Sequence, residues 1–147
     1  MPSSETDEGL TGGCHCGGVR FVYSGTLGGP LGAVTLCWCA DCRRAQGFAA
    51  AVAPAAAAGL RLVRGADLVC EYESSPGKRR AFCRACGSPL YSRRDDRPEA
   101  LRLRLGALDQ TPEGLRIEAQ IHAAGRPAWA AHAGDAPSYP ASEPGRR

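Results

Sequence analysis

Residues 37–44 read Cys37-Trp38-Cys39-Ala40-Asp41-Cys42-Arg43-Arg44, which places three thiols within six residues. Two more cysteine motifs lie far from this stretch along the chain, Cys14-His15-Cys16 and Cys83-Arg84-Ala85-Cys86. Seven of the eight cysteines therefore fall into three short motifs. Such clustering predicts that the sulfurs converge in the folded protein on disulfides, on iron or on zinc.

The composition favours metal over disulfides. The chain has 147 residues, 44% of them hydrophobic and 22% charged, which fits one globular domain. Residues 1–8 are polar and acidic and lack the apolar region of a secretory signal, and the apolar run 48–60 is too short to cross a bilayer. We therefore expect a cytoplasmic protein without membrane contact, in which clustered thiols stay reduced and bind metal.

Short β-type segments separated by glycine and proline predict a mainly β fold with little helix. The expected strands are residues 19–23, 33–36, 48–53, 60–64, 68–73, 78–82, 88–93, 101–105 and 116–122, with a helical turn at 43–46 and a turn or short helix at 54–59. In the alternating stretch 101–105, we expect the leucines to face the core and Arg102 and Arg104 to point outward. We expect a flexible tail at residues 1–10, one domain over residues 11–140 and a second flexible tail at residues 141–147.

The seven clustered cysteines divide naturally into four plus three. Structural zinc is held by four ligands, whereas catalytic zinc keeps three protein ligands and one exchangeable position. The two-thiol motifs at 14/16 and 83/86 can close one site, and the contiguous trio can hold a second ion with one face open. Other divisions stay open, because Cys70 or His15 can also fill the fourth position. Iron sites of the rubredoxin type need two Cys-x-x-Cys-Gly motifs, and Cys42 is followed by arginine, which favours zinc.

Three motifs in order carry a resemblance to a known family: Gly-Gly-Cys14-x-Cys16-Gly-x-Val19-Arg20-Phe21, Cys37-x-Cys39-x-x-Cys42-Arg43-Arg44 and Phe82-Cys83-x-x-Cys86-Gly87-Ser88-x-Leu90. The chain resembles the glutathione-dependent formaldehyde-activating enzyme family, whose domain is shared with centromere protein V. The likeness extends from Gly12 to Pro140. One departure is Trp38, because family members commonly have histidine at this position.

The resemblance implies an Mss4-like β-tent built from hairpins that are joined by zinc, with two zinc ions. By the family pattern, the structural zinc is bound by Cys14, Cys16, Cys83 and Cys86. The second, catalytic zinc is bound by Cys37, Cys39 and Cys42. The implied activity is that of a carbon–sulfur lyase on thiol–aldehyde adducts such as S-(hydroxymethyl)glutathione, with glutathione or a similar small thiol as the partner.

The basic residues offer a second indication of function. Residues 78–104 contain nine basic and three acidic residues, although the formal net charge of the whole chain is only +3. Arginines can hold the carboxylates of a glutathione-like substrate in bidentate pairs, and Arg43 and Arg44 are expected to do so beside the open site. The alternative is a non-catalytic zinc module that contacts a protein or an acidic polymer through this arginine-rich surface. Nucleic acid is a less favoured partner, because no aromatic residues interleave with the arginines.

Overall fold

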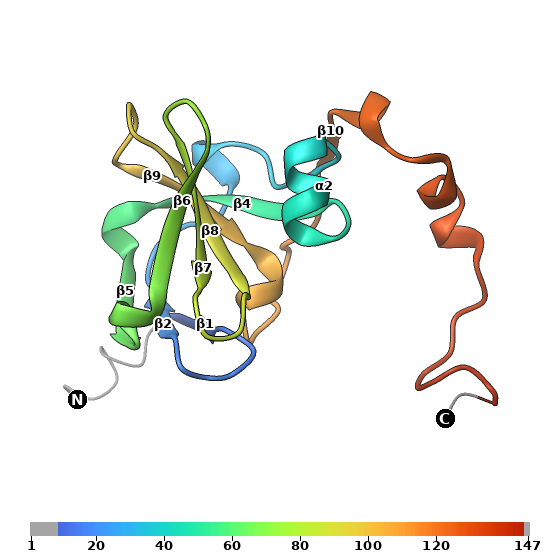
Figure 1. Cartoon of the computed structure of the whole chain (residues 1–147), viewed down its shortest axis with the longest axis horizontal. Helices are drawn as coiled ribbons and strands as arrows, with labels where there is room; N and C mark the ends of the chain where they lie inside the picture. The colour runs from blue at the N-terminus through green and yellow to red at the C-terminus, as the bar shows by residue number, and fades with distance from the viewer. Residues whose placement is uncertain (1–8, 146–147) are drawn as a thin grey trace.

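Two largely antiparallel sheets form the framework of the fold in the computed structural model, which describes residues 9–145 (Figure 1). The smaller sheet has the strand order β1-β2-β5, and the larger has the order β10-β3-β4-β9-β8-β7-β6, in which only the β10–β3 pair is parallel. The strands are β1 (Leu10–Gly13), β2 (Arg20–Tyr23), β3 (Thr35–Cys37), β4 (Ala50–Ala56), β5 (Leu60–Arg64), β6 (Val69–Ser75), β7 (Lys78–Cys83), β8 (Pro89–Arg94), β9 (Ala100–Arg104) and β10 (Ala119–Ile121).

The described residues contain one α-helix, α2 (Ala40–Gln46). Short 3-10 turns are η1 (Gly29–Leu31), η2 (Ala57–Gly59), η3 (Ala66–Leu68), η4 (Leu105–Ala107), η5 (Ala123–Gly125), η6 (Ala128–Ala130) and η7 (Ala133–Asp135). The mainly β prediction is therefore confirmed, whereas the finer assignment to an Mss4-like β-tent stays a prediction. No helix within residues 9–145 is long and apolar enough to cross a bilayer.

The main core is formed by apolar side chains of both sheets. Phe21 and Tyr23 of β2 are buried in one cluster with Leu101 and Leu103 of β9. The buried Tyr23 hydroxyl donates to the Thr26 carbonyl at 2.6 Å and accepts from the Ala56 N–H at 2.9 Å, so its polar atom is satisfied. The leucines of β9 thus face the core, as their alternation predicted.

The segment 54–56 is strand, where a turn or short helix was expected. Residues 54–56 continue β4 and pair with residues 100–102 of β9. The Pro54 carbonyl accepts from the Gly28 N–H at 2.9 Å, so it points away from β9. In an antiparallel ladder the N and O of one residue point to the same side, so the N–H that proline lacks would point away from β9 and no β4–β9 bond is lost.

The structure describes only part of each of the two expected tails. β1 begins at Leu10, one residue before the expected start of the domain, and most of the expected tail 1–10 lies outside the described residues. The last two residues of the expected tail 141–147 also lie outside them. After β10, the chain leaves the sheets as an extended arm, orange to red in Figure 1. On this arm, the Trp129 ring lies beside the Phe48 ring, with centroids 6.2 Å apart.

Candidate metal centres

Four cysteines from two facing turns form the first cluster. Their sulfur atoms all lie within 4.8 Å of one another: Cys14, Cys16, Cys83 and Cys86. The Cys14 and Cys16 sulfurs are 3.5 Å apart, and the Cys16 and Cys83 sulfurs are 3.9 Å apart. Thiolates that surround zinc tetrahedrally at about 2.3 Å have sulfurs roughly 3.8 Å apart. The first cluster therefore fits a closed four-sulfur metal site.

The turns that carry this cluster explain the glycines beside it. Gly17 and Gly87 have φ values of 78° and 80°, a left-handed conformation that glycine adopts without strain. The Gly87 N–H donates to the Cys83 carbonyl at 2.7 Å and so closes the turn. One turn joins β1 to β2 in the small sheet, and the other joins β7 to β8 in the large sheet. A metal ion held by both turns would link the two sheets.

The local hydrogen bonds favour thiolates at Cys14 and Cys86. At Cys16, in contrast, the Gly18 N–H lowers the pKa but the neighbouring thiols and burial together raise it to about 11. The Val19 N–H donates to the Cys14 sulfur at 3.2 Å, and the Gly18 N–H donates to the Cys16 sulfur at 3.4 Å. The Ser88 hydroxyl, 3.2 Å from the Cys86 sulfur, lowers the pKa of that thiol to about 5. Hydrogen bonds to the charged form stabilise the form that binds metal.

Three cysteines form the second cluster at a strand-to-helix junction. The sulfurs of Cys37, Cys39 and Cys42 all lie within 4.8 Å of one another. Cys37 ends β3, and Cys39 caps α2 by accepting from the Cys42 N–H at 3.3 Å. The predicted helical turn is confirmed and starts earlier, at Ala40, and Gly47 ends it with a φ of 79°. This cluster supplies three corners of a tetrahedron, and neither Cys70 nor His15 belongs to it.

Strand register gathers positive side chains on the face of the large sheet that carries the second cluster. Arg80 of β7 pairs with Ser92 of β8, and Ser92 pairs with Arg102 of β9. Directly paired residues share a face, and so do residues two apart in one strand. Lys78 and Arg104 therefore join this row. The core leucines alternate with these cations and lie on the opposite face.

A cavity of about 260 Å³ lies between this cationic face and the trio. Its wall contains the three thiols of the trio, one carboxylate, one imidazole and five cations: Cys37, Cys39, Cys42, Asp41, His122, Lys78, Arg80, Arg94, Arg102 and Arg104. The expectation that Arg102 and Arg104 point outward from the core is therefore confirmed, but both side chains line this cavity. Arg104 is only 5% exposed, because α2 lies close enough for Gln46 to accept from its Nε at 2.7 Å.

Most of these cations lack a carboxylate partner. Within residues 9–145, four of them form no ion pair with any carboxylate: Lys78, Arg80, Arg102 and Arg104. Burial lowers the pKa of Arg104 to about 10, and burial followed by the charge of Arg102 lowers the pKa of Lys78. Buried charge without a counter-charge is costly. The cavity therefore favours an anionic occupant.

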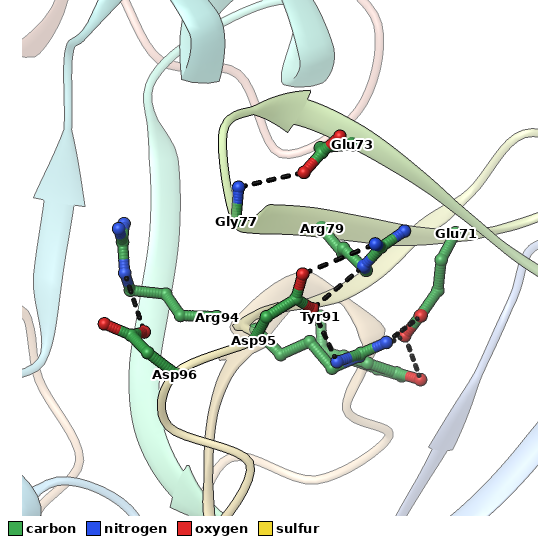
Figure 2. A network of polar contacts seen from close by, with 9 residues as sticks. Glu71, Glu73, Gly77, Arg79, Tyr91, Arg94, Asp95 and Asp96 are labelled. Carbon is green, nitrogen blue, oxygen red and sulfur yellow. Dashed lines mark hydrogen bonds and ion pairs between the residues drawn. The ribbon is translucent and has the colours of Figure 1, made fainter.

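On the opposite face of the same strands, the arginines are paired with carboxylates. There Arg93 pairs with Glu71 at 2.7 Å and with Asp95 at 3.2 Å, and Arg79 pairs with Asp95 at 2.9 Å (Figure 2). The Arg93 hydrogen bond also holds the pKa of Glu71 below its ordinary value. Unpaired cations are thus a property of the cavity face and not of the basic segment as a whole.

Arg80 connects the cationic face to the trio. Its Nη1 and Nη2 atoms each lie 3.7 Å from the Cys42 sulfur, and its Nε donates to the Ser74 hydroxyl at 3.0 Å. Burial disfavours the Cys39 thiolate, but the Cys42 N–H, the neighbouring thiols and the charge of Arg80 together lower the pKa of Cys39. Burial raises the pKa of Cys37 to about 12.

Two arginines expected to bind substrate lie outside the cavity wall. Arg43 and Arg44 are on α2, and neither lines the cavity. The cations that do line it were visible in the sequence only as a basic segment. His122 was also missed, although it is the only non-glycine residue within 9–145 with a positive φ, 53°. Its strained backbone beside the cavity is the kind of feature that clusters at functional sites, and it cannot be read from residue type.

Cys70 is the cysteine outside both clusters. It lies half-buried on β6 and pairs in register with Phe82. We expect Cys70→Ala to retain the full metal content of the wild type and to cost about 1–2 kcal/mol of packing energy at most. Metal analysis of the purified variant checks this expectation. Loss of one metal equivalent would make Cys70 a ligand.

The chain is similar to known proteins. The family described as glutathione-dependent formaldehyde-activating enzyme matches residues 9–124, so residues 125–140 of the resemblance lie beyond the match. The crystal structure of a Rhodobacter sphaeroides protein, a structural-genomics target, is 28% identical, covers 75% of this chain and 98% of its own, and has a TM-score of 0.59. No curated protein matches significantly. Because the family match spans most of the chain and both cysteine clusters, this protein belongs to the glutathione-dependent formaldehyde-activating enzyme family.

Proposed function

We propose that the protein is a zinc-dependent carbon–sulfur lyase that makes and breaks thiol–aldehyde adducts such as S-(hydroxymethyl)glutathione. One observation carries the proposal: a three-thiol cluster opens onto a cavity whose buried cations have no carboxylate partners. Cys14, Cys16, Cys83 and Cys86 would hold a structural zinc, and Cys37, Cys39 and Cys42 a second zinc. Zinc bound by the trio would keep a substrate thiol deprotonated near neutral pH.

The cavity cations would position the thiol. Glutathione has two carboxylates, and guanidinium groups bind carboxylates through paired, charge-assisted hydrogen bonds. Arg80 and Arg104 are 6% and 5% exposed, so their bonds to a substrate would form away from bulk water. Asp41 is the carboxylate on the cavity wall and would receive the ammonium group of the same substrate.

The reaction is an addition and its reverse. The thiol sulfur donates an electron pair to the carbonyl carbon, a carbon–sulfur bond forms, and the carbonyl π pair moves to the oxygen. That oxygen gains one proton, and the thiol proton leaves to solvent. His122 is the imidazole on the cavity wall, and we assign it to proton transfer at the carbonyl oxygen.

The binding-module alternative has less support from the placement of the arginines. Arg79, Arg93, Arg94 and Arg97 in the basic segment each pair with a nearby carboxylate. Three further arginines of the segment turn into the cavity: Arg80, Arg102 and Arg104. Little of the segment is therefore left as an unpaired basic surface for an acidic polymer.

The proposal is tested with the full chain loaded with zinc. Glutathione and formaldehyde also combine without a catalyst, and exchange NMR measures how fast the adduct forms and decays with and without the protein. We expect the protein to accelerate both directions equally, because a catalyst does not move an equilibrium, and we expect Cys39→Ser to abolish the acceleration. An unchanged exchange rate with fully loaded wild type would reject the lyase. Binding of an acidic polymer that weakens steeply with salt would then support the module.

A further inference from the structure

A second, largely apolar cavity adjoins the cationic one. It has a volume of about 490 Å³, within the range of roughly 300–1,000 Å³ that is typical of small-molecule sites. Its wall includes four apolar or aromatic side chains and two arginines: Ala45, Tyr72, Phe82, Pro89, Arg80 and Arg104. We call it the apolar groove. A one-carbon aldehyde has no substituent that would use such a space.

Strand register places the apolar groove on the same sheet face as the cations. Tyr72 of β6 pairs directly with Arg80 of β7, and Phe82 lies two residues beyond Arg80. The Tyr72 and Phe82 rings pack edge to face with centroids 6.1 Å apart, and Ala45 of α2 completes the wall. The face therefore changes from cationic to aromatic along β7, with Arg80 at the boundary.

The two cavities share their most buried charged residues. Arg80 and Arg104 line both the cationic cavity and the apolar groove. They are 6% and 5% exposed, and neither pairs with a carboxylate within residues 9–145. Because the Arg80 guanidinium also lies 3.7 Å from the Cys42 sulfur, the groove begins one side chain away from the trio.

The groove also exposes apolar surface, and its burial by a ligand would contribute to binding free energy. Tyr72 is 46% exposed even though its ring packs on Phe82. Burial of apolar surface contributes about 25 cal/mol per Å², and an aromatic wall adds a preference for flat or chain-like groups. A ligand with an anionic end at the arginines and an apolar end in the groove would match both halves of the face.

We propose that the apolar groove binds the substituent of the aldehyde, so that the substrates are adducts of an anionic thiol with an aromatic or medium-chain aldehyde. This inference rests on the proposed lyase activity. The step is the same addition: the sulfur bonds to the carbonyl carbon, the π pair moves to the oxygen and takes up a proton, and the thiol proton leaves. The substituent on that carbon extends past Arg80 into the groove.

Stable thioethers of glutathione test the groove without any reaction. The ligands are S-methyl-, S-butyl- and S-hexylglutathione. The first alkyl carbon of each thioether occupies the place of the former carbonyl carbon in the adduct, and the rest of the alkyl chain stands in for the aldehyde substituent. Calorimetric titration of the zinc-loaded full chain should show affinity rising roughly two- to fourfold per added methylene, because each buried methylene contributes about 0.8 kcal/mol. Equal affinity for the methyl and hexyl compounds would overturn the inference.

Two tyrosine variants test whether the dependence of affinity on chain length arises in the apolar groove. Tyr72→Ser removes an aromatic wall of the groove and should flatten the dependence of affinity on chain length. Tyr139→Ser is the control, because Tyr139 is similarly exposed, at 51%, but lies on the C-terminal arm and does not line the groove. If Tyr72→Ser does not fold, Ala45→Gln on exposed α2 narrows the same groove and should flatten the same slope. A slope that survives both groove variants would contradict the assignment.

A series of simple carboxylates distinguishes a failure of the groove assignment from a failure of the proposed lyase function. If no glutathione derivative binds, the thiol assignment of the lyase fails. Butyrate, hexanoate and octanoate then test the groove alone, with the carboxylate at the shared arginines and the chain in the groove. Affinity that rises with chain length in this series would keep an anionic, apolar ligand at the groove, and a flat series would reject it.

Discussion

Replacing Cys83 by serine is expected to leave the domain unfolded or insoluble. Cys83 is fully buried, and its sulfur belongs to the cluster that joins the turn of the small sheet to that of the large one. Structural zinc contributes about 10–16 kcal/mol in zinc-finger peptides, and a whole domain is stable by only about 5–15 kcal/mol. Weakening one of four ligands therefore removes a large part of the folding free energy. Circular dichroism and metal analysis of the variant provide the measurement.

Cys70→Ser is the matched control for Cys83→Ser. It makes the same chemical change at a half-buried cysteine outside both clusters, so the domain should fold and keep the metal content of the wild type. A Cys83→Ser protein with the wild-type metal content and melting temperature would contradict the four-cysteine site.

Arg104→Met should weaken binding of anionic thiols roughly 10- to 100-fold. The expectation follows from the loss of charge-assisted hydrogen bonds, each of which contributes about 1.5–3 kcal/mol. Stability should change much less, because the substitution also removes a buried cation that has no carboxylate partner, and methionine fills much of its volume. Calorimetric titration with glutathione measures the affinity, and thermal unfolding measures the stability.

The double variant Arg43→Met/Arg44→Met distinguishes the cavity cations from the arginines that the sequence suggested. Both arginines lie on α2 outside the cavity, so the double variant should bind glutathione as the wild type does. If the double variant loses affinity while Arg104→Met retains it, the substrate lies against α2 and the cavity assignment is wrong.

The cysteine clusters were predictable because the cysteines within each motif are close in sequence. Cys37, Cys39 and Cys42 converge through one strand-to-helix junction, and each pair of the other cluster belongs to one tight turn. The strand bounds were also set locally: Leu60–Arg64 matches its predicted bounds, because Gly59 and Gly65 flank it. In these places the sequence neighbours are also the spatial neighbours.

The cationic cavity could not be predicted because it depends on strand order and register. Arg80, Ser92 and Arg102 come from three strands and become neighbours only through the β7–β8–β9 pairing. The alternation on β9 correctly placed Arg102 and Arg104 opposite the core leucines. It could not indicate that α2 lies close to that face, so a face expected to contact water became a cavity wall. Arg43 and Arg44 were expected to bind substrate because they follow Cys42 in sequence, but they do not line this cavity.

The central claim is that the trio keeps one coordination position open for a substrate thiol. With cobalt in place of zinc, each thiolate that binds the metal adds sulfur-to-metal charge-transfer absorption, which makes ligation visible. Titration of the cobalt-loaded wild type with glutathione should raise this absorption and saturate at one thiol per protein. Cys39→Ser should stay folded through the other cluster and lose the response. A wild-type spectrum that no thiol changes would mean that the second site is closed, and the carbon–sulfur chemistry would have to be abandoned.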